Sequence, residues 1–354
     1  MRPLPPGAVI GMLGGGQLGR MMAGAAAQLG YDTHVFSPER DSPAGRVSAT
    51  ETVADYLDEA ALEAFATQCD VVTYEFENVP VEAVAILEAA GATVRPGAMA
   101  LEKAQDRLIE KRFLNETGIE SVIFEPVDAP SAIALGLERL GGEGILKRRR
   151  EGYDGKGQVR VEIGDDYAAA WKALGEAPCI LEALAPFECE ISAIVGRAAD
   201  DTLTSFEPSR NTHVNGILRR SEVPARVSDD TMAEAVRHAC RLANALDYVG
   251  VLALEFFVLP GGNLLANEFA PRVHNSGHWT PEACETGQFE QHIRAVAGLP
   301  FGPSKRRFDA VMDNLLGEEA ILAAGEPGVT LYGKGEPRPG RKMGHKVTRI
   351  KPVG

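Results

Sequence analysis

The sequence predicts a mixed α/β and α+β protein, with a parallel-sheet domain first, a small α+β domain next and an antiparallel-sheet domain last. Apolar strands alternate with helical segments over about the first 95 residues. A glycine-rich basic loop follows a short strand near residue 150, and two long apolar strands flank a Pro-Gly-Gly-Asn turn near residue 260. At 354 residues the chain exceeds the usual size of one core, so two or three packed units are expected.

Composition is typical of a globular enzyme, because 45% of the residues are hydrophobic and 24% are charged. The formal net charge of -14 opposes nucleic-acid binding, so an anionic substrate has to be held by local basic segments, here 147–150 and 338–351. The first 16 residues lack a secretory or membrane-spanning pattern, and we expect a cytoplasmic protein that does not bind membranes. Five scattered cysteines suggest neither disulfides nor a zinc site.

The N-terminal elements form a βαβαβ pattern, which predicts a parallel sheet. A polar helix is expected next, ending at Gly118, which is a normal C-terminal stop. Short strands and glycines from about Val122 to Leu184 predict a small α+β unit, and from Pro186 onward we expect antiparallel strands and one helix. The predicted strands are Ala8–Met12, Thr33–Phe36 and Val71–Tyr74, and the predicted helices are Arg20–Leu29, Leu57–Ala66, Leu101–Glu116 and Thr231–Leu246.

The segment Gly14-Gly15-Gly16-Gln17-Leu18-Gly19 lies between an apolar strand and a helix, where backbone amides bind anions. Alone, it favours a Rossmann-type dinucleotide site, and Glu39 follows at about the distance of a ribose-binding acid. However, the second strand ends in Ser37-Pro38 before that acid, which misplaces its carboxylate. A nicotinamide-dependent oxidoreductase and a plain tight turn both stay open on this motif.

A pair of carboxylates is the strongest chemical signal in the chain. The apolar strand around Glu255 and the strand around Glu268 predict a hairpin, and a turn centred on Gly261-Gly262 would place the two glutamates opposite each other. Two facing carboxylates among apolar side chains repel and lose solvation unless a cation joins them. Mg²⁺ accepts one or two carboxylates and completes its shell with water and phosphate. The alternative is that both acids lie on a solvated face of the sheet.

Residues 148–158 predict a loop that closes over phosphate and excludes water from a reactive intermediate. A flexible, solvated hairpin is the alternative. Next, Cys179-Ile180-Leu181-Glu182 continues into Ala183-Leu184-Ala185-Pro186, as expected of an interdomain connection that lines an adenine site. Glu190 could accept hydrogen bonds from ribose hydroxyls, or it could be an ordinary surface acid of a strand.

Together these segments resemble the ATP-grasp superfamily and, within it, the 5-(carboxyamino)imidazole ribonucleotide synthases. The resemblance spans nearly the whole chain and is carried by five segments. They are Gly11 to Gly19, Tyr74 to Pro80, Glu151 to Gln158, Asn267 to His278 and Gly340 to His345. It implies a Rossmann-like pre-ATP-grasp domain at 1–118, a small ATP-grasp lid domain at 119–184 and a C-terminal ATP-grasp domain at 185–354.

The resemblance implies a ligase that uses ATP, Mg²⁺ and bicarbonate. ATP phosphorylates bicarbonate to carboxyphosphate, whose carbon is captured, as carbon dioxide, by the exocyclic amine of 5-aminoimidazole ribonucleotide. It also implies a homodimer. The implied nucleotide site comprises Arg107, Lys147, Gly152, Tyr153, Asp154, Gly155, Lys156, Gly157, Gln158, Glu182, Ala183, Leu184, Ala185, Glu190, His213, Asn267 and Glu268, and the implied magnesium ligands are Glu255 and Glu268.

The implied ribonucleotide site comprises Gly15, Gly16, Gln17, Leu18 and the segment Glu75 to Asn78, with Asn275, and Lys342 and Arg349 would supply charge for phosphate or bicarbonate. The resemblance implies Arg272, His274 and Lys342 as catalytic residues beside Asp154. The first two also fit on chemistry alone, because an anion favours a guanidinium fork and a nearby donor. For Arg349 a solvated tail residue is the alternative, and for His213 a packed loop histidine. The run Arg148-Arg149-Arg150 receives no role.

Asp154 is a candidate general base, since capture of carbon dioxide requires the amine to lose a proton. A turn-forming aspartate is the alternative. Three other functions stay open: the oxidoreductase, a non-catalytic ATP-binding protein, and another ATP-grasp purine enzyme that uses formate or an amino acid. Glu255 and Glu268 argue against the first two, because hydride transfer does not require them and a decayed site would not retain them.

Overall fold

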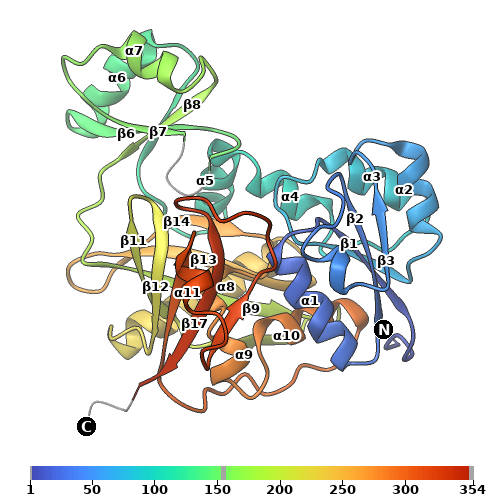
Figure 1. The fold of residues 1–354 in the computed structure, drawn as a ribbon. Coiled ribbons are helices and arrows are strands. Elements are labelled where there is room, and N and C mark those ends of the chain that lie inside the picture. Colours follow the sequence, from blue (N-terminus) through green and yellow to red (C-terminus); the bar gives the residue numbers. More distant parts are fainter. Residues whose placement is uncertain (1, 153–156, 351–354) are drawn as a thin grey trace.

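The computed structural model describes residues 2–152 and 157–350, which form three sheets. A parallel sheet at the N-terminus and a small antiparallel sheet lie at different edges of a large antiparallel sheet (Figure 1). The predicted fold class is confirmed. Among the described residues no helix is both long and apolar enough to cross a membrane.

The N-terminal sheet has the strand order β3-β2-β1-β4, with every neighbouring pair parallel. Helix α1 packs against β2 on this sheet and against α10 of the C-terminal region, so that it joins the two (Figure 1). The predicted βαβαβ pattern is present, with an additional strand and helix. Its elements are β1 (Val9–Leu13), α1 (Gln17–Gln28), β2 (Asp32–Ser37), β3 (Thr50–Val53), α2 (Glu59–Ala66), β4 (Val71–Tyr74) and α3 (Val81–Ala89).

The single helix predicted over residues 101–116 is wrong, because two helices occupy this stretch: α4 (Ala98–Ala104) and α5 (Arg107–Glu116). The chain breaks at Asp106, whose backbone is extended and whose carboxylate accepts hydrogen bonds from the amides of Leu108 and Ile109. Aspartate favours this N-cap position over a helix interior, where its side chain competes with the backbone. Helix α5 therefore begins at Arg107, beside the candidate site.

The small sheet has the order β5-β8-β6-β7, is antiparallel and carries two helices on one side (Figure 1). Trp171 and Leu146 lie in the compact apolar cluster between this sheet and its helices. Its elements are β5 (Phe124–Val127), α6 (Ser131–Leu140), β6 (Glu143–Arg148), β7 (Gln158–Glu162), α7 (Tyr167–Ala173) and β8 (Cys179–Ala183).

The large sheet follows the path β14-β13-β9-β11-β12-β15-β17-β16, with β10 paired to β9. Strand β13 is covered on both faces: Leu252 and Leu254 pack in the cluster that includes α8, while Val251 and Ala253 pack in the cluster that includes α1 and α10. The sheet elements are β9 (Cys189–Arg197), β10 (Leu203–Ser205), β11 (Ser209–Val214), β12 (Ile217–Val223), β13 (Gly250–Val258), β14 (Leu264–Ala270), β15 (Ala310–Leu316), β16 (Val329–Leu331) and β17 (Lys342–Arg349).

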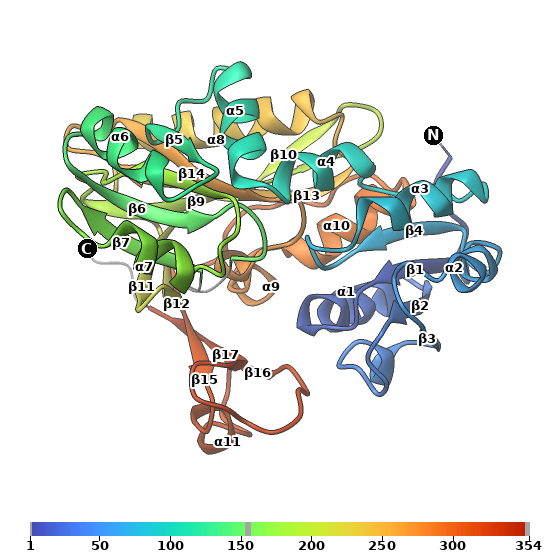
Figure 2. The same cartoon turned by 90° about the horizontal axis from the view of Figure 1, so that it is seen from above.

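The prediction of one helix after residue 186 is wrong. Besides α8 (Asp229–Ala245), the structure contains α9 (Thr280–Ala283), α10 (Gln288–Ala297) and α11 (Glu319–Leu322). Helix α10 ends at Gly298 in the left-handed conformation and is largely buried, including its polar residues Gln288, Gln291 and His292. Figure 2 shows β15, β16, β17 and α11 extending away from the rest of the molecule.

Candidate active site

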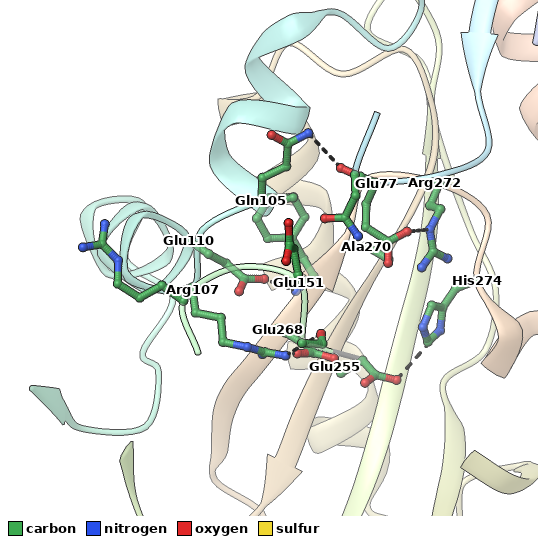
Figure 3. A pocket seen from close by; sticks show the side chains of 15 residues that line it. Glu77, Gln105, Arg107, Glu110, Glu151, Glu255, Glu268, Ala270, Arg272 and His274 are labelled. Carbon is green, nitrogen blue, oxygen red and sulfur yellow. Dashed lines mark hydrogen bonds and ion pairs between the residues drawn. The ribbon is translucent and has the colours of Figure 1, made fainter. Parts of the chain in front are cut away.

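A polar pocket lies where the small sheet, helix α5, the loop after β4 and strands β13 and β14 meet (Figure 3). Figure 3 shows Glu255 and Glu268 near its centre, Arg107 on one side and Arg272 with His274 on the other. The pocket contains about 600 Å³ of empty space, part of it open to solvent. Its charged and polar lining consists of Glu77, Asn78, Gln105, Arg107, Glu110, Arg149, Glu151, Glu255, Glu268, Arg272 and His274.

The two glutamates lie opposite each other because of a β-bulge. Near the turn, β13 and β14 pair one residue out of the predicted register, with Phe256 opposite Ala266. Beyond the bulge, Leu254 pairs with Phe269, which is the predicted register. Glu255 therefore faces two residues of β14, Asn267 and Glu268. The predicted turn centre is wrong by half a residue, but the bulge brings Glu255 and Glu268 opposite each other as predicted. Bulges commonly redirect side chains at functional sites.

The two carboxylates have opposite electrostatic environments. Burial raises the pKa of Glu255 to about 7; His213 opposes this shift and the charge of Glu268 reinforces it. Burial also acts to raise the pKa of Glu268, but Arg107 outweighs it and holds that pKa at about 2. The guanidinium Nη1 of Arg107 lies 2.5 Å from Glu268 Oε2. Arg107 is therefore the main group that neutralises Glu268.

Asn267 precedes Glu268 on β14 and lies opposite Glu255 in the register of the two strands. Its Oδ1 is buried and has no hydrogen-bond partner within the described part of the chain. A buried oxygen without a partner calls for an explanation, and a bound ion is one. No group of three or more carboxylate, His or Cys side chains with metal-ligand geometry occurs among residues 2–152 and 157–350. Two carboxylates and an amide oxygen suit Mg²⁺, whose remaining ligands are water and phosphate.

Three charged side chains meet between helix α5 and the small sheet. Lys147 Nζ donates to Glu182 Oε2 at 2.6 Å. Lys111 lies 3.2 Å from the other carboxylate oxygen, as an ion pair without hydrogen-bond geometry, and donates to the carbonyl of Asn267 at 2.9 Å. Burial acts to raise the pKa of Glu182, but Lys111 and Lys147 outweigh it and hold the pKa at about 2. The charged Glu182 therefore holds two lysines at the end of β8.

The segment after Glu182 connects the small sheet to β9. The amide of Ala183 donates to the carbonyl of Ile123, and the amide of Phe187 to that of Ala185. On β9, Glu190 Oε2 lies 2.9 Å from Nδ1 of His213 on β11. Burial acts to lower the pKa of His213, but Glu190 and Glu255 outweigh it, so the pKa is raised.

Arg272 and His274 form the opposite side of the pocket. The Arg272 side chain is 15% exposed, and its Nε donates to Glu77 on the loop after β4. His274 Nδ1 lies 2.8 Å from the Ser276 hydroxyl and 3.8 Å from Glu255 Oε1. Burial, Arg272 and Lys342 lower the pKa of His274 to about 3, so the imidazole is neutral at physiological pH. A guanidinium and a neutral imidazole can together bind an anion and accept a proton.

The glycine loop is already occupied by a carboxylate of this chain. The amides of Gly16 and Gly19 donate to the two oxygens of Glu75 at 2.8 and 3.1 Å. A Cβ at Gly14 would lie 2.6 Å from the Glu75 side chain, so this position has to be glycine. Glu39 is exposed and its amide donates to the Ser37 hydroxyl. The amides that would bind a dinucleotide pyrophosphate are thus already used.

Some of the remaining predicted site residues line the pocket and others lie outside it. Asn78 lines the pocket, whereas Leu18 packs in the apolar core. Asn275 is buried and hydrogen-bonded to His278 and Asn314. Gly152 lines the pocket, the carbonyl of Gly157 accepts from Arg148, and Gln158 is exposed at the start of β7. Glycines 15 and 16 and Gln17 lie where β1 joins α1, while Leu184 lies in the segment between β8 and β9.

The structure separates Lys342 from Arg349. They are the first and last residues of β17, about 20 Å apart along a strand. Lys342 contributes to the electrostatic environment of His213 and His274, whereas the exposed Arg349 stacks 5.1 Å from the ring of Phe308. The structure therefore does not bring Arg349 to this pocket. Tyr153, Asp154, Gly155 and Lys156 lie outside the described residues.

Helix α5 supplies site residues that the sequence prediction missed. Glu110 is buried and its Oε1 accepts from the Phe269 amide at 2.6 Å, while burial and Glu268 raise the pKa of Glu110 to about 8. Lys111 is fully buried. Residues 107, 110, 111 and 114 share one helical face, and three of them are charged. Charged residues in the stripe of a helix that faces a core are a signal that could have located this side of the site.

Comparison with known proteins gives one consistent family. The chain matches a ribonucleotide synthetase preATP-grasp domain at residues 8–105, an ATP-grasp domain at 112–289 and a phosphoribosylaminoimidazole carboxylase C-terminal domain at 310–351. An N5-carboxyaminoimidazole ribonucleotide synthase from Brucella melitensis is 54% identical over 99% of this chain and 98% of its own length.

Two solved structures are similar over the whole chain. An N5-carboxyaminoimidazole synthetase from Staphylococcus aureus complexed with ADP has a TM-score of 0.94 and 37% identity, covering 100% of this chain and 96% of its own. An N5-carboxyaminoimidazole synthase from Aspergillus clavatus, in complex with ADP and 5-aminoimidazole ribonucleotide, has a TM-score of 0.89 and 31% identity, covering 98% of this chain and 94% of its own.

Proposed function

Because the chain belongs to the N5-carboxyaminoimidazole ribonucleotide synthase family, we propose that it carboxylates 5-aminoimidazole ribonucleotide with bicarbonate, at the expense of ATP, in purine biosynthesis. It is an ATP-dependent carbon–nitrogen ligase. The observation that carries the finer assignment is a pocket with carboxylate oxygens at its centre, Arg107 on one side, and Arg272 and His274 on the other.

The nucleotide lies between the small sheet and the large sheet in this proposal. Arg107 pairs with Glu268, and Lys147 also acts on the charge of Glu268, so both cations are available to bind the phosphates. Glu182 and the segment 183–185 line the adenine side, and Glu190 with His213 accepts or donates hydrogen bonds at the ribose. The ADP in the related structures supports a nucleotide in this fold.

The residues present also fit Mg²⁺. Glu255, Glu268 and the unpartnered Oδ1 of Asn267 would hold it. When bound, Mg²⁺ neutralises phosphate oxygens and polarises the terminal phosphorus of ATP. It would also relieve the repulsion between two carboxylates that face each other, since Arg107 pairs with Glu268 and not with the buried Glu255.

Bicarbonate lies on the Arg272 side in this proposal. Arg272 is kept charged and oriented by Glu77, and His274 is kept neutral. A bicarbonate oxygen attacks the γ-phosphorus of ATP, the bond to ADP breaks, and carboxyphosphate forms. Loss of phosphate releases carbon dioxide, whose carbon bonds to the exocyclic amine as that nitrogen loses a proton. Asp154 stays the predicted base for that proton, and Lys342 the predicted cation for phosphate or bicarbonate.

The ribonucleotide site proposed from the sequence, comprising residues 15–18, 75–78 and Asn275, adjoins Arg272 through Glu77. Several further properties stay predictions from the sequence: the homodimer, the cytoplasmic location and the domain boundaries at 118/119 and 184/185. The oxidoreductase hypothesis is wrong, because the family is a ligase family and the amides of the glycine loop bind Glu75.

Release of ADP, measured with each candidate acceptor and with or without bicarbonate, tests the proposal. We expect rapid release only when 5-aminoimidazole ribonucleotide and bicarbonate are both present, with incorporation of labelled bicarbonate carbon into the product. Release that depends on formate or an amino acid would favour another ATP-grasp purine enzyme. Release that no acceptor stimulates would contradict the acceptor side of the site.

A further inference from the structure

The run Arg148-Arg149-Arg150 contains one residue whose contacts differ from those of its neighbours. We propose that Arg149 is a positioning residue: through Asp106 it fixes the start of helix α5, and thereby holds Arg107 in place for the nucleotide. This inference rests on the proposed function, since it assigns the run a role in the same nucleotide site.

Arg149 makes a two-pronged contact with Asp106. Its Nε donates to Asp106 Oδ1 at 2.9 Å and its Nη2 to Oδ2 at 2.8 Å. The Asp106 side chain is 6% exposed and that of Arg149 is 22% exposed, so the contact is largely shielded from water. Bidentate arginine–carboxylate pairs fix geometry as well as supply energy, which a single point charge does not.

The same carboxylate is the cap of helix α5. Asp106 Oδ1 accepts from the amides of Leu108 at 3.0 Å and Ile109 at 3.4 Å. Asp106 thus uses one side chain to bind both the guanidinium and the first turn of the helix. Any shift of Arg149 therefore displaces the group that defines where α5 begins.

The backbone of Arg149 extends this connection in two directions. Its carbonyl accepts from the amide of Arg107 at 2.9 Å, and its own amide donates to the carbonyl of Pro178, next to β8 of the small sheet. Arg107 in turn reaches Glu268 on β14 and the carbonyl of Gly152 at 3.1 Å. Arg149 therefore links the small sheet to α5, and α5 carries Arg107 to the large sheet.

The neighbouring arginines lack these contacts. Arg148 pairs at 3.3 Å with the exposed Glu151. Arg150 is 60% exposed and its Nε lies 3.6 Å from Asp106 Oδ2, beyond hydrogen-bond distance. Because the three residues are identical in type and adjacent in sequence, Arg150 offers a matched control for Arg149.

Steady-state kinetics and calorimetric ADP binding test this role with Arg149→Met, Arg150→Met and Arg107→Met. Losing a charge-assisted contact in the site corresponds to roughly a 10- to 100-fold weaker interaction. We expect Arg149→Met to raise the KM for ATP and weaken ADP binding by this order, with the KM for the ribonucleotide nearly unchanged. Arg150→Met should be close to the unmodified enzyme. Arg149→Lys should restore little, because lysine lacks the fork.

Asp106→Asn is a second variant. It keeps the helix cap, since asparagine caps a helix as well as aspartate, but it loses one of the two oxygens that accept hydrogen bonds from the Arg149 guanidinium. In the double variant with Arg149→Met the effects on ATP should not add, as expected for residues acting as one unit. Suppose that Arg107→Met fails to bind ADP, as the proposed nucleotide site requires. The inference is then overturned if Arg149→Met and Arg150→Met bind ATP equally well, or if Arg149→Met loses thermal stability and nothing else. Unchanged ADP binding by Arg107→Met would overturn the nucleotide site and this inference with it.

Discussion

Glu268 keeps its negative charge at the pocket because Nη1 of Arg107 lies 2.5 Å from its Oε2. Its partner across the bulge, Glu255, accepts a hydrogen bond from the Ser192 hydroxyl at 3.0 Å and is close to histidines rather than to an arginine. The pKa of Glu255 is raised to about 7 by burial, with Glu268 adding to it. Two identical side chains thus differ in charge state through their neighbours alone.

Glu268→Gln should abolish ATP turnover, because the amide keeps the shape of the side chain but removes a carboxylate from the proposed magnesium site. The circular dichroism spectrum should be unchanged. Glu162→Gln, on an exposed strand position, makes the same substitution away from the pocket and should turn over ATP normally. Near-normal turnover of the Glu268→Gln enzyme at limiting magnesium would refute the facing-carboxylate site.

At the scale of the elements, the sequence located the strands well and the breaks between elements poorly. The runs of apolar residues in β4 and in the hairpin β13–β14, and the turn residues of that hairpin, identify these strands clearly in the sequence. The break at Asp106 was missed because the residues on both sides favour helices, and the bulge at Glu255 was missed because a register is set by pairing rather than by local sequence. Both irregularities lie at the pocket.

Helix α5 carries a fully buried lysine whose loss should be costly. Lys111→Met should lower the free energy of unfolding by about 3 kcal/mol, because it removes a partner of the buried Glu182 carboxylate and leaves the Asn267 carbonyl without its donor. Arg112→Met changes the next, exposed residue of the same helix and should shift stability by less than about 0.5 kcal/mol. Urea unfolding followed by circular dichroism measures both. Equal midpoints would mean that Lys111 contributes nothing.

Strand β17 offers a second element-scale comparison, since its two ends carry Lys342 and Arg349. Lys342→Ala should weaken use of the ribonucleotide or bicarbonate, by a contact free energy of roughly 1.5–3 kcal/mol, much more than ATP binding. Arg349→Ala should leave all kinetic constants nearly unchanged, because its side chain stacks on Phe308. An equal effect of Lys342→Ala on ATP affinity would move this strand to the nucleotide side.

The whole molecule is held together by buried polar contacts as well as apolar clusters. His292 of α10 joins the N-terminal and C-terminal sheets: its Nε2 lies 2.8 Å from the Thr73 hydroxyl, and its Nδ1 accepts from the Val251 amide. Burial lowers the pKa of His292 to about 4. The imidazole is therefore neutral in the folded protein over a range of pH where it is protonated in the unfolded chain.

Acid should consequently destabilise this junction. Between pH 6.5 and about 4 the unfolded chain binds a proton at His292 that the folded protein excludes, so the free energy of unfolding falls as the pH falls. One such group contributes about 1.4 kcal/mol per pH unit within this window. His292→Gln should be less stable at pH 7 but lose stability less steeply on acidification, as measured by urea unfolding at several pH values. Identical slopes for both proteins would contradict the assignment.

The carboxylate of Glu75 within the glycine loop has a consequence for ligand discrimination. A loop of this shape normally presents free amides to phosphate, and in a cell many nucleotides and phosphate esters can bind to such amides. Here the chain supplies its own anion from the neighbouring strand, so the loop keeps its backbone path but repels a second negative charge. Replacing Glu75 with a neutral residue would uncover a phosphate receptor that the native protein keeps masked, and free phosphate would then compete at the mouth of the acceptor site.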